Sequence, residues 1–269
     1  IQVDVVHLHG LDFDRYLPDQ PCLCLATLHL PPDWYSPEIF RLSRPHTLLN
    51  CVSKNQRERC PDSSLPIQTI PPGIDVDYFS FASIHKRGYA VALGRICPEK
   101  GFHTAIEAAA LADVPLLMAG QVFAYEAHQR YYEQQIAPRL NRRARFIGPV
   151  GLRKKRRLLA GARCVLIPGT APETSSLVAM ESLACGTPVI AFPSGALPSI
   201  VEHGRTGFLV KDETEMAAAI HRAAEIDPAA CRRAARERFR SDRMVEDYLR
   251  VYSNVLRAHR GFFRASCGS

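Results

Sequence analysis

Residues 163–192 read RCVLIPGTAPETSSLVAMESLACGTPVIAF, and this stretch decides the fold class. Two continuous apolar runs, 163–168 and 188–192, flank a helix-like segment at 175–186. Short apolar runs without polar alternation indicate strands buried on both faces, as in a parallel sheet. A helix between two such strands is typical of a right-handed crossover. The stretch therefore predicts an α/β fold.

The same alternation extends in both directions from this unit. We expect strands at 88–94, 115–120, 144–148, 163–168, 188–192 and 207–210. We expect helices at 98–112, 125–137, 152–162, 175–186 and 197–204, and then over most of 213–226 and 228–260. Six parallel strands with intervening helices indicate a doubly wound, Rossmann-like domain.

The N-terminal part has a less regular pattern. Strands are predicted at 3–8, 21–28, 46–52 and 65–70, with helical or irregular pieces between them. Pro71, Pro72 and Gly73 then break regular structure, and no clear period follows up to Arg87. We therefore expect three parts, which are an α/β domain over 1–84, the Rossmann-like domain over 85–240 and a C-terminal helix over 241–269.

Composition limits the class of protein. The chain has 269 residues, of which 46% are hydrophobic and 23% charged, as in ordinary globular proteins. No apolar run reaches the ~20 residues that span a bilayer. The start has no signal-peptide pattern and no initiator Met, so we expect the chain to begin within a longer protein. Nine irregularly spaced cysteines without a Cys-x-x-Cys pair predict a reduced, cytosolic protein without structural zinc.

Charge is distributed unevenly along the chain. Residues 1–85 hold 6 Lys/Arg against 10 Asp/Glu, whereas 86–269 hold 28 against 17. A basic C-terminal part suits an anionic ligand, nucleic acid or an acidic membrane surface. A basic cluster, formed by Arg139, Arg142, Arg143, Arg145 and the run 153–157, suggests peripheral membrane contact, with a solvated helix face as the alternative. Nucleic-acid binding is not expected, because no aromatic residues interleave with these charges.

Two strand ends carry the residues of greatest chemical interest. Arg95 and Lys100 follow the strand at 88–94, and their cationic heads are suited to neutralising a diphosphate. The alternative is ordinary surface charge on a loop. The Asp-x-Asp pair of Asp75 and Asp77 follows the Pro-Pro-Gly turn and is interpreted as part of a linker. No metal site is therefore predicted.

The second strand end precedes a helix that starts near Ser176. Thr174 or Ser175 is expected to cap it, and its N-terminus would attract phosphate. Glu173 precedes this helix and Glu181 lies eight residues later, about 12 Å along it. That span matches a nucleoside-diphosphate sugar, with Glu173 at the hexose and Glu181 at the ribose. In the alternative, the Glu173 charge interacts favourably with the helix dipole and Glu181 is solvated.

The combination of motifs resembles the retaining family 4 glycosyltransferases of the GT-B fold. ETSSLVAMESLACGTPVIAF is similar to that family's Glu-x7-Glu signature, and IPPGIDVDYF, VALGRICPEKGF, RARFIGPVG and VEHGRTGFLV occur in its order. TLHLPP and NCVSKNQRERC resemble segments of its N-terminal domain. The further strands and glycine-rich loop with which the family begins have no counterpart before Ile1. The resemblance thus implies a complete donor domain, a partial acceptor-side domain and a terminal helix that returns to it.

The resemblance also implies roles for individual residues. Arg95 and Lys100 would contact the donor phosphates together with the Ser176–Leu177 backbone. Glu173 would position the donor sugar and Glu181 would hold the ribose. Val150 would lie near the base, and His29 would face the transferred sugar, although a structural histidine is the alternative at that position. The resemblance thus implies that the catalytic residues are Glu173, Arg95, Lys100 and His29. It implies that the donor-binding residues are Arg95, Lys100, Val150, Ser176, Leu177 and Glu181.

The implied reaction is metal-independent transfer of a sugar, with retention, from a UDP-, GDP- or ADP-sugar to an acceptor hydroxyl on a glycan, lipid or small molecule. No cofactor is implied. Thr174, Ser175 and Ser176 stand where the family often has Gly or aromatic residues, so the donor sugar stays open. Two alternatives are a noncatalytic sugar-nucleotide-binding fragment and a nucleotide-sugar epimerase of the same fold. The expected location is the cytoplasm, with peripheral contact at the inner membrane face as an option.

Overall fold

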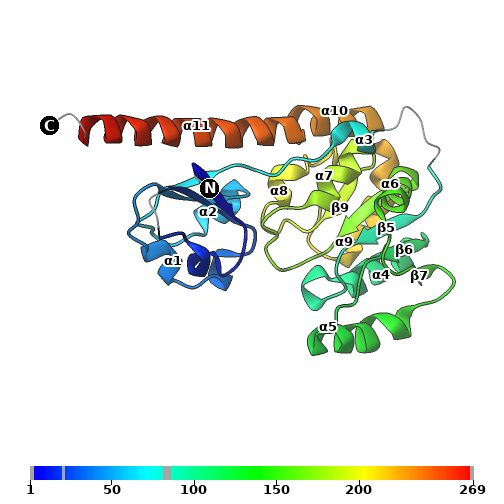
Figure 1. The fold of residues 1–269 in the computed structure, drawn as a ribbon. Helices are drawn as coiled ribbons and strands as arrows, with labels where there is room; N and C mark the ends of the chain where they lie inside the picture. Colours follow the sequence, from blue (N-terminus) through cyan, green and yellow to red (C-terminus); the bar gives the residue numbers. More distant parts are fainter. Residues whose placement is uncertain (1–2, 20–21, 81–85, 267–269) are drawn as a thin grey trace. The chain divides into compact units, whose positions relative to one another are not determined.

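The chain folds into two compact units (Figure 1). The computed structural model describes residues 3–19, 22–80 and 86–266. One unit combines Ile1–Gly73 with Ser241–Ser269, and the other comprises Ile74–Arg240. Each unit is built on its own parallel sheet.

The larger unit contains a six-stranded sheet in which every neighbouring pair is parallel, in the order β10-β9-β8-β5-β6-β7. All six predicted strands are present, so this prediction is confirmed. Their buried runs explain the continuous apolar sequence, since helices cover both faces of a doubly wound sheet. The strands are β5 (Ala90–Leu93), β6 (Leu116–Ala119), β7 (Ala144–Phe146), β8 (Cys164–Ile167), β9 (Val189–Ala191) and β10 (Gly207–Leu209).

The strand order reverses between β5 and β8. Strands β6 and β7 extend the sheet on one side of β5, and β9 and β10 extend it beyond β8. In open α/β sheets, ligands bind beyond the carboxyl ends of the strands at such a switch point. The fold thereby selects the loops after β5 and β8 as the place to look for a site.

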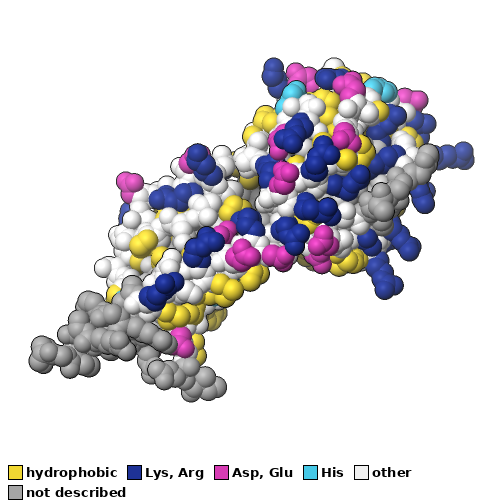
Figure 2. All heavy atoms as spheres, turned by 90° about the horizontal axis from the view of Figure 1, so that it is seen from above, with side chains coloured by type: hydrophobic (Ala, Val, Ile, Leu, Met, Phe, Trp, Pro, Cys, Tyr) yellow, Lys and Arg dark blue, Asp and Glu magenta, His cyan; other side chains and the backbone are white. Residues whose placement is uncertain are grey.

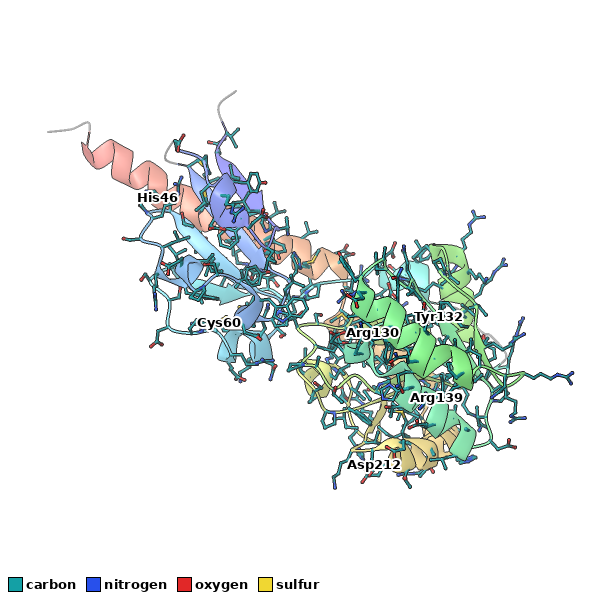
Figure 3. The ribbon with its side chains drawn as sticks, turned by 90° about the horizontal axis from the view of Figure 1, so that it is seen from below. His46, Cys60, Arg130, Tyr132, Arg139 and Asp212 are labelled. Atoms are coloured by element: carbon teal, nitrogen blue, oxygen red, sulfur yellow. The ribbon has the colours of Figure 1, made fainter. Side chains whose placement is uncertain are left out.

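The helices of the larger unit follow the predicted segments with three differences. They are α3 (Val76–Phe79), α4 (Phe102–Leu111), α5 (Glu126–Tyr131), α6 (Leu152–Gly161), α7 (Leu177–Ala184), α8 (Leu197–Ile200), α9 (Glu213–Arg222) and α10 (Pro228–Arg238). Helix α5 continues as a π-helical turn over Tyr132–Ile136, along which Figure 3 labels Tyr132. Asp212, also labelled there, caps α9 by accepting a hydrogen bond from the Glu215 amide.

The three differences have local causes. The short helix α3 was not predicted, and it forms because the Asp75 side chain accepts from the Tyr78 amide at 2.8 Å. Helix α8 is shorter than predicted because the backbone is extended at Val201. The predicted helix over 228–260 is interrupted after Arg238, where the Phe239 carbonyl accepts a hydrogen bond from the Ile74 amide at 2.8 Å.

The smaller unit contains a four-stranded parallel sheet in sequence order, β1 (Val5–Leu8), β2 (Leu23–Leu28), β3 (Thr47–Cys51) and β4 (Ile67–Thr69). Strand β2 is buried along its whole length. Short helices connect the strands, including α1 (Glu38–Arg41) and α2 (Lys54–Glu58). Phe13, Phe40 and Leu65 are among the core residues of this unit.

Helix α11 (Ser241–Ser266) belongs to the smaller unit although it follows the larger one in the chain. Its Tyr248 hydroxyl accepts a hydrogen bond from the Asn50 amide at 3.1 Å, and its Tyr252 hydroxyl lies 2.6 Å from His7 Nδ1. Two tyrosines of this helix thus contact side chains of the four-stranded sheet. The smaller unit is therefore closed by a segment from the other end of the chain.

Candidate functional site

A cavity of about 210 Å³ lies at the switch point of the larger sheet. Its lining includes Gly94, Arg95 and Lys100 from the loop after β5, and Glu173, Ser176 and Leu177 from the segment after β8. The structure therefore brings five of the sequence-predicted site residues to one place. Glu181, Val150 and His29 are not among the lining residues of this cavity.

Close backbone packing holds the two loops of the cavity together. Gly101 has φ of +64°, and a Cβ at this position would lie 2.6 Å from the Pro168 carbonyl oxygen. A Cβ on Gly169 would lie 2.9 Å from the Glu99 carbonyl oxygen. Side chains at these positions would push the loops apart, so glycine permits the close approach.

The Lys100 ammonium and the Glu173 carboxylate form an ion pair across the cavity. The Lys100 side chain is 27% exposed and that of Glu173 is 11% exposed. Arg95 is more exposed and lines the same cavity. One carboxylate and two cationic groups thus share a small, partly enclosed volume, where charge interactions are stronger than in bulk water.

Helix α7 points its N-terminus into the cavity, since Ser176, Leu177 and Val178 all line it. The N-cap is Ser176, whose hydroxyl accepts from the Ala179 amide at 3.4 Å. The expected cap at Thr174 or Ser175 is therefore wrong by one or two residues. The open amides of the first turn and the helix dipole favour an anion at this position.

A turn after β9 supports Glu173 and was missed by the sequence analysis. The Ala196 amide donates to the Glu173 carbonyl at 2.7 Å. Gly195 has φ of +60°, and a Cβ there would lie 2.2 Å from the same carbonyl oxygen. The Pro-Ser-Gly-Ala sequence at 193–196 signals a turn, but only the fold brings that turn against Glu173.

Glu181 lies inside α7 and is 6% exposed, so the alternative that it is solvated is wrong. Its Oε1 pairs with Lys155 Nζ of α6 at 2.6 Å, while its Oε2 is buried and accepts no hydrogen bond within the part of the chain described. Burial raises the pKa of the Glu181 carboxyl, and Lys155 opposes that shift.

His29 belongs to the smaller unit, whereas the other candidates belong to the larger one. Its Nε2 lies 2.9 Å from His9 Nδ1, and its amide donates to the Tyr35 hydroxyl at 2.8 Å. Burial lowers the pKa of His29 and lowers that of His7 to about 4, with neighbouring histidines adding to both shifts. His29 is thus part of a group of neighbouring histidines in the smaller unit.

Val150 follows β7 and is half-buried, in the loop between Gly148 and Gly151. Asp75 and Asp77 both contact other groups of the larger unit. Asp75 caps α3, and Asp77 Oδ1 lies 3.6 Å from Arg236 Nη2 of α10.

The eight cysteines within the described residues are free thiols, and Cys267 lies outside that part.

Comparison with solved structures identifies the fold class. AviGT4, a glycosyltransferase involved in avilamycin A biosynthesis, aligns over 95% of this chain and 75% of its own, with a TM-score of 0.73 and 24% identity. HepE from Anabaena, solved in complex with UDP-glucose, aligns over 93% of this chain and 79% of its own, with a TM-score of 0.77 and 21% identity. The predicted fold is confirmed, because the two parallel-sheet units match GT-B glycosyltransferases.

The chain belongs to the group 1 glycosyl transferases, whose family model matches residues 75–240. A D-inositol 3-phosphate glycosyltransferase from Mycobacterium sp. (strain KMS) is 34% identical over 186 residues, which cover 64% of this chain and 42% of the relative. A protein of the same name from Mycolicibacterium smegmatis is 30% identical over 212 residues, which cover 72% of this chain and 49% of the relative. The chain thus spans about half the length of these relatives. The family match thus supports a transferase family and gives no support to the two alternatives, the noncatalytic fragment and the epimerase.

Proposed function

We propose that the protein transfers a sugar from a nucleoside-diphosphate sugar to an acceptor hydroxyl with retention of anomeric configuration, and that the cavity between β5 and β8 binds the donor diphosphate. One observation carries the proposal. Two cations, a carboxylate and the N-terminus of α7 converge on one cavity at the switch point of the sheet. The family membership supports the reaction class.

Arg95, Lys100 and the first amides of α7 act on the leaving group. Cleavage of the bond between the sugar and the phosphate places negative charge on the departing diphosphate, and preorganised cations and amides stabilise that charge as it develops. The acceptor oxygen forms its bond to the anomeric carbon on the same face, and its proton passes to a diphosphate oxygen. This sequence requires no covalent bond to Glu173.

When the donor binds, Lys100 and Glu173 exchange their contact with each other for contacts with the donor. When the diphosphate enters, Lys100 gains a doubly charged partner in place of the carboxylate. Glu173 is then able to accept hydrogen bonds from hydroxyls of the donor sugar, as a positioning group for the transferred unit. The rigid turn at Gly195 and Ala196 supports the backbone that carries this carboxylate.

The remaining donor contacts are proposed for Glu181, Val150 and His29. Glu181 is the proposed ribose ligand, because its Oε2 has no hydrogen-bond partner among the residues that the structure describes. Val150 is proposed to lie near the base, and His29 to approach the transferred sugar. The acceptor is proposed to be a hydroxyl of a glycan, lipid or small molecule, and the matched D-inositol 3-phosphate glycosyltransferases make a small polyol phosphate the first acceptor to test.

A donor screen tests the proposal. The chain is incubated with UDP-, GDP- and ADP-sugars and candidate acceptors without added Mg²⁺ or Mn²⁺, and nucleoside diphosphate is measured by mass spectrometry. Release that depends on the acceptor, with a product that keeps the donor's anomeric configuration by NMR, is expected. Donor binding by calorimetry without release for any acceptor would instead support the noncatalytic alternative, and loss of retention would overturn the proposed mechanism.

Peripheral contact with an anionic membrane at the cytoplasmic face is a second proposal, and it rests on α6. Lys and Arg side chains gather on the larger unit (Figure 2), and Arg153, Lys154 and Arg157 are exposed. Lys155 pairs with Glu181, and Arg156 lies over the Tyr78 ring, so part of the basic run acts within the fold. None of the helices in the described residues is long and apolar enough to span a bilayer. Flotation with vesicles that contain or lack anionic lipid tests this contact, and equal flotation would refute it.

A further inference from the structure

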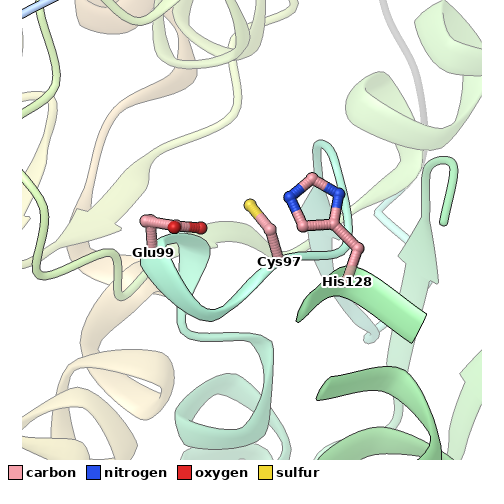
Figure 4. A group of neighbouring side chains, drawn as sticks. All are labelled: Cys97, Glu99 and His128. Atoms are coloured by element: carbon pink, nitrogen blue, oxygen red, sulfur yellow. The ribbon is translucent and has the colours of Figure 1, made fainter. Parts of the chain in front are cut away.

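Three metal-ligating side chains come together in the loop that follows β5 and in α5. Cys97, Glu99 and His128 each offer one ligand atom, and these atoms all lie within 4.8 Å of one another. Figure 4 shows the Cys97 sulfur between the Glu99 carboxylate and the His128 ring. None of the three is among the residues that line the cavity of the candidate site.

Two of the three side chains are buried, and the Cys97 thiol has a long contact of 3.6 Å with the Arg95 carbonyl oxygen. The Cys97 side chain is 1% exposed and His128 is 9% exposed. The His128 ring is held by packing, with the Tyr125 ring centroid at 5.2 Å and that of Phe123 at 6.4 Å. Its Nδ1 is buried and has no hydrogen-bond partner in the described part of the chain. The other ring nitrogen, Nε2, faces the Cys97 sulfur in Figure 4, so Nε2 is the atom that would bind an ion held by the three side chains.

The chemistry of the three groups favours zinc. Thiolate, imidazole and carboxylate are all zinc ligands, with bond lengths of about 2.0–2.3 Å. Ligand atoms around a tetrahedral zinc ion are therefore about 3.5 Å apart, and side-chain movements of about 1 Å bring the observed group to that spacing. A hard cation such as Mg²⁺ prefers oxygen ligands and does not suit a thiolate.

We propose that Cys97, Glu99 and His128 bind a zinc ion, with water as the fourth ligand, which ties the loop after β5 to helix α5. As the bond between sulfur and zinc forms, the thiol proton of Cys97 passes to solvent. Cys97 and Glu99 lie between Arg95 and Lys100 in one short loop, so the ion would restrain the segment that carries both cations. The expectation of no structural zinc rested on cysteine spacing, which does not detect a ligand 31 residues away in the chain.

Cobalt titration of the metal-free chain tests this site without any assay of activity. Binding of one Co²⁺ is expected to give a near-ultraviolet thiolate charge-transfer band and visible bands of tetrahedral intensity, and Zn²⁺ is expected to displace it. Cys97→Ser is expected to abolish the charge-transfer band. His128→Gln is expected to weaken binding by about 10- to 100-fold or more, because the loss of even an outer partner has an effect of that size.

Cys60→Ser is the matched control, since Cys60 is a free thiol outside the group and lies 3.5 Å from a second sulfur, that of Cys51. This variant is expected to keep the band. Circular dichroism establishes that each variant is folded, and Glu99→Gln offers a third substitution at a more exposed position. Absence of the band in the parent, or its persistence in both Cys97→Ser and His128→Gln, would overturn the proposal.

Hydrogen exchange tests the proposed consequence for the loop. Addition of Zn²⁺ is expected to slow exchange of the backbone amides in residues 95–101 and 126–131 of the parent and to leave Cys97→Ser unchanged. Equal exchange with and without zinc in the parent would show that the ion does not restrain the loop. Both readouts are independent of the proposed transferase activity, so either proposal can fail alone.

Discussion

Two Lys–Glu ion pairs lie near helix α7, one before its N-terminus and one along its length. The pair of Lys100 and Glu173 lines the cavity before the helix, whereas the pair of Lys155 and Glu181 joins the helix to α6. The exposed fractions are similar, 27% and 11% in the first pair and 26% and 8% in the second. Burial alone therefore does not distinguish a candidate catalytic pair from a structural one.

The difference lies in what else faces each pair. Arg95 and the open end of α7 accompany the first pair, so an anion that enters the cavity is able to displace Glu173 from Lys100. Neither residue of the second pair lines that cavity. In the described part of the chain, one Glu181 oxygen of this pair has no hydrogen-bond partner. The first arrangement suits exchange of partners, whereas in the second Lys155 holds one Glu181 oxygen in place and the other oxygen is the one proposed to bind the ribose.

The largest expected effect comes from Lys100→Ala. Loss of one preorganised cation is expected to cost about 2–4 kcal/mol of transition-state stabilisation, which is roughly a 30- to 1,000-fold fall in turnover. Nucleoside diphosphate release measures it. The matched control is Lys211→Ala, in which an 83% exposed lysine is removed and turnover stays at the parental rate. Equal turnover in Lys100→Ala and the parent would remove Lys100 from the mechanism.

Gly195→Ala tests whether the position of Glu173 matters as much as its charge. The new Cβ meets the Glu173 carbonyl oxygen, so the segment must shift, and turnover is expected to fall by about 10- to 100-fold. Gly204→Ala is the matched control, because Gly204 also has a positive φ, of +75°, but has nothing within 4 Å of the added Cβ. If both variants lose the same activity, backbone strain rather than displacement of Glu173 is responsible.

Lys155→Met addresses the second pair and is expected to act on stability. It leaves the buried Glu181 carboxylate without its partner, which is expected to lower the free energy of unfolding by about 1–3 kcal/mol. Urea unfolding measures the change. Lys154→Met, at the exposed neighbouring position, is expected to stay within about 0.5 kcal/mol of the parent. A fall of the same size in both would contradict a structural role for the pair.

Glu181→Gln is expected to change how stability depends on pH, and this is the smallest of the four effects. The pKa of Glu181 is raised above its ordinary value of 4.5 in the folded protein. The parent therefore loses stability as pH rises from that value through the raised folded pKa, because the folded state takes up more protons than the unfolded state. The Gln variant has no such loss. Parallel melting-temperature profiles of parent and variant against pH would refute this.

Much of the larger unit was predictable from local sequence. Its six strands appear where the apolar runs predicted them, because a strand buried on both faces needs an unbroken apolar segment. Helix ends were less predictable. The cap of α7 was placed one or two residues early, since Thr174, Ser175 and Ser176 are all suitable capping residues and their local sequence does not separate them.

The candidate site was predictable in part. Arg95, Lys100 and Glu173 were recognised from their positions at strand ends, but Gly195 was not, because its role depends on contact with Glu173 across two loops. Glu181 was expected to be a ribose ligand or solvated, and its ion pair with Lys155 has no signal in the sequence. The group of Cys97, Glu99 and His128 was missed for the same reason.

The sequence by itself determined the parallel sheets, the strand ends that carry charge and the family, because apolar periodicity and short motifs are local properties of the chain. Only the tertiary structure decided which carboxylate faces a cavity, which turn supports Glu173 and which thiol meets a histidine. Each of these contacts joins residues that are distant in the chain. The strand order and the packing of loops decide which of those residues meet. Such long-range contacts, which the sequence does not show, distinguish the two Lys–Glu pairs.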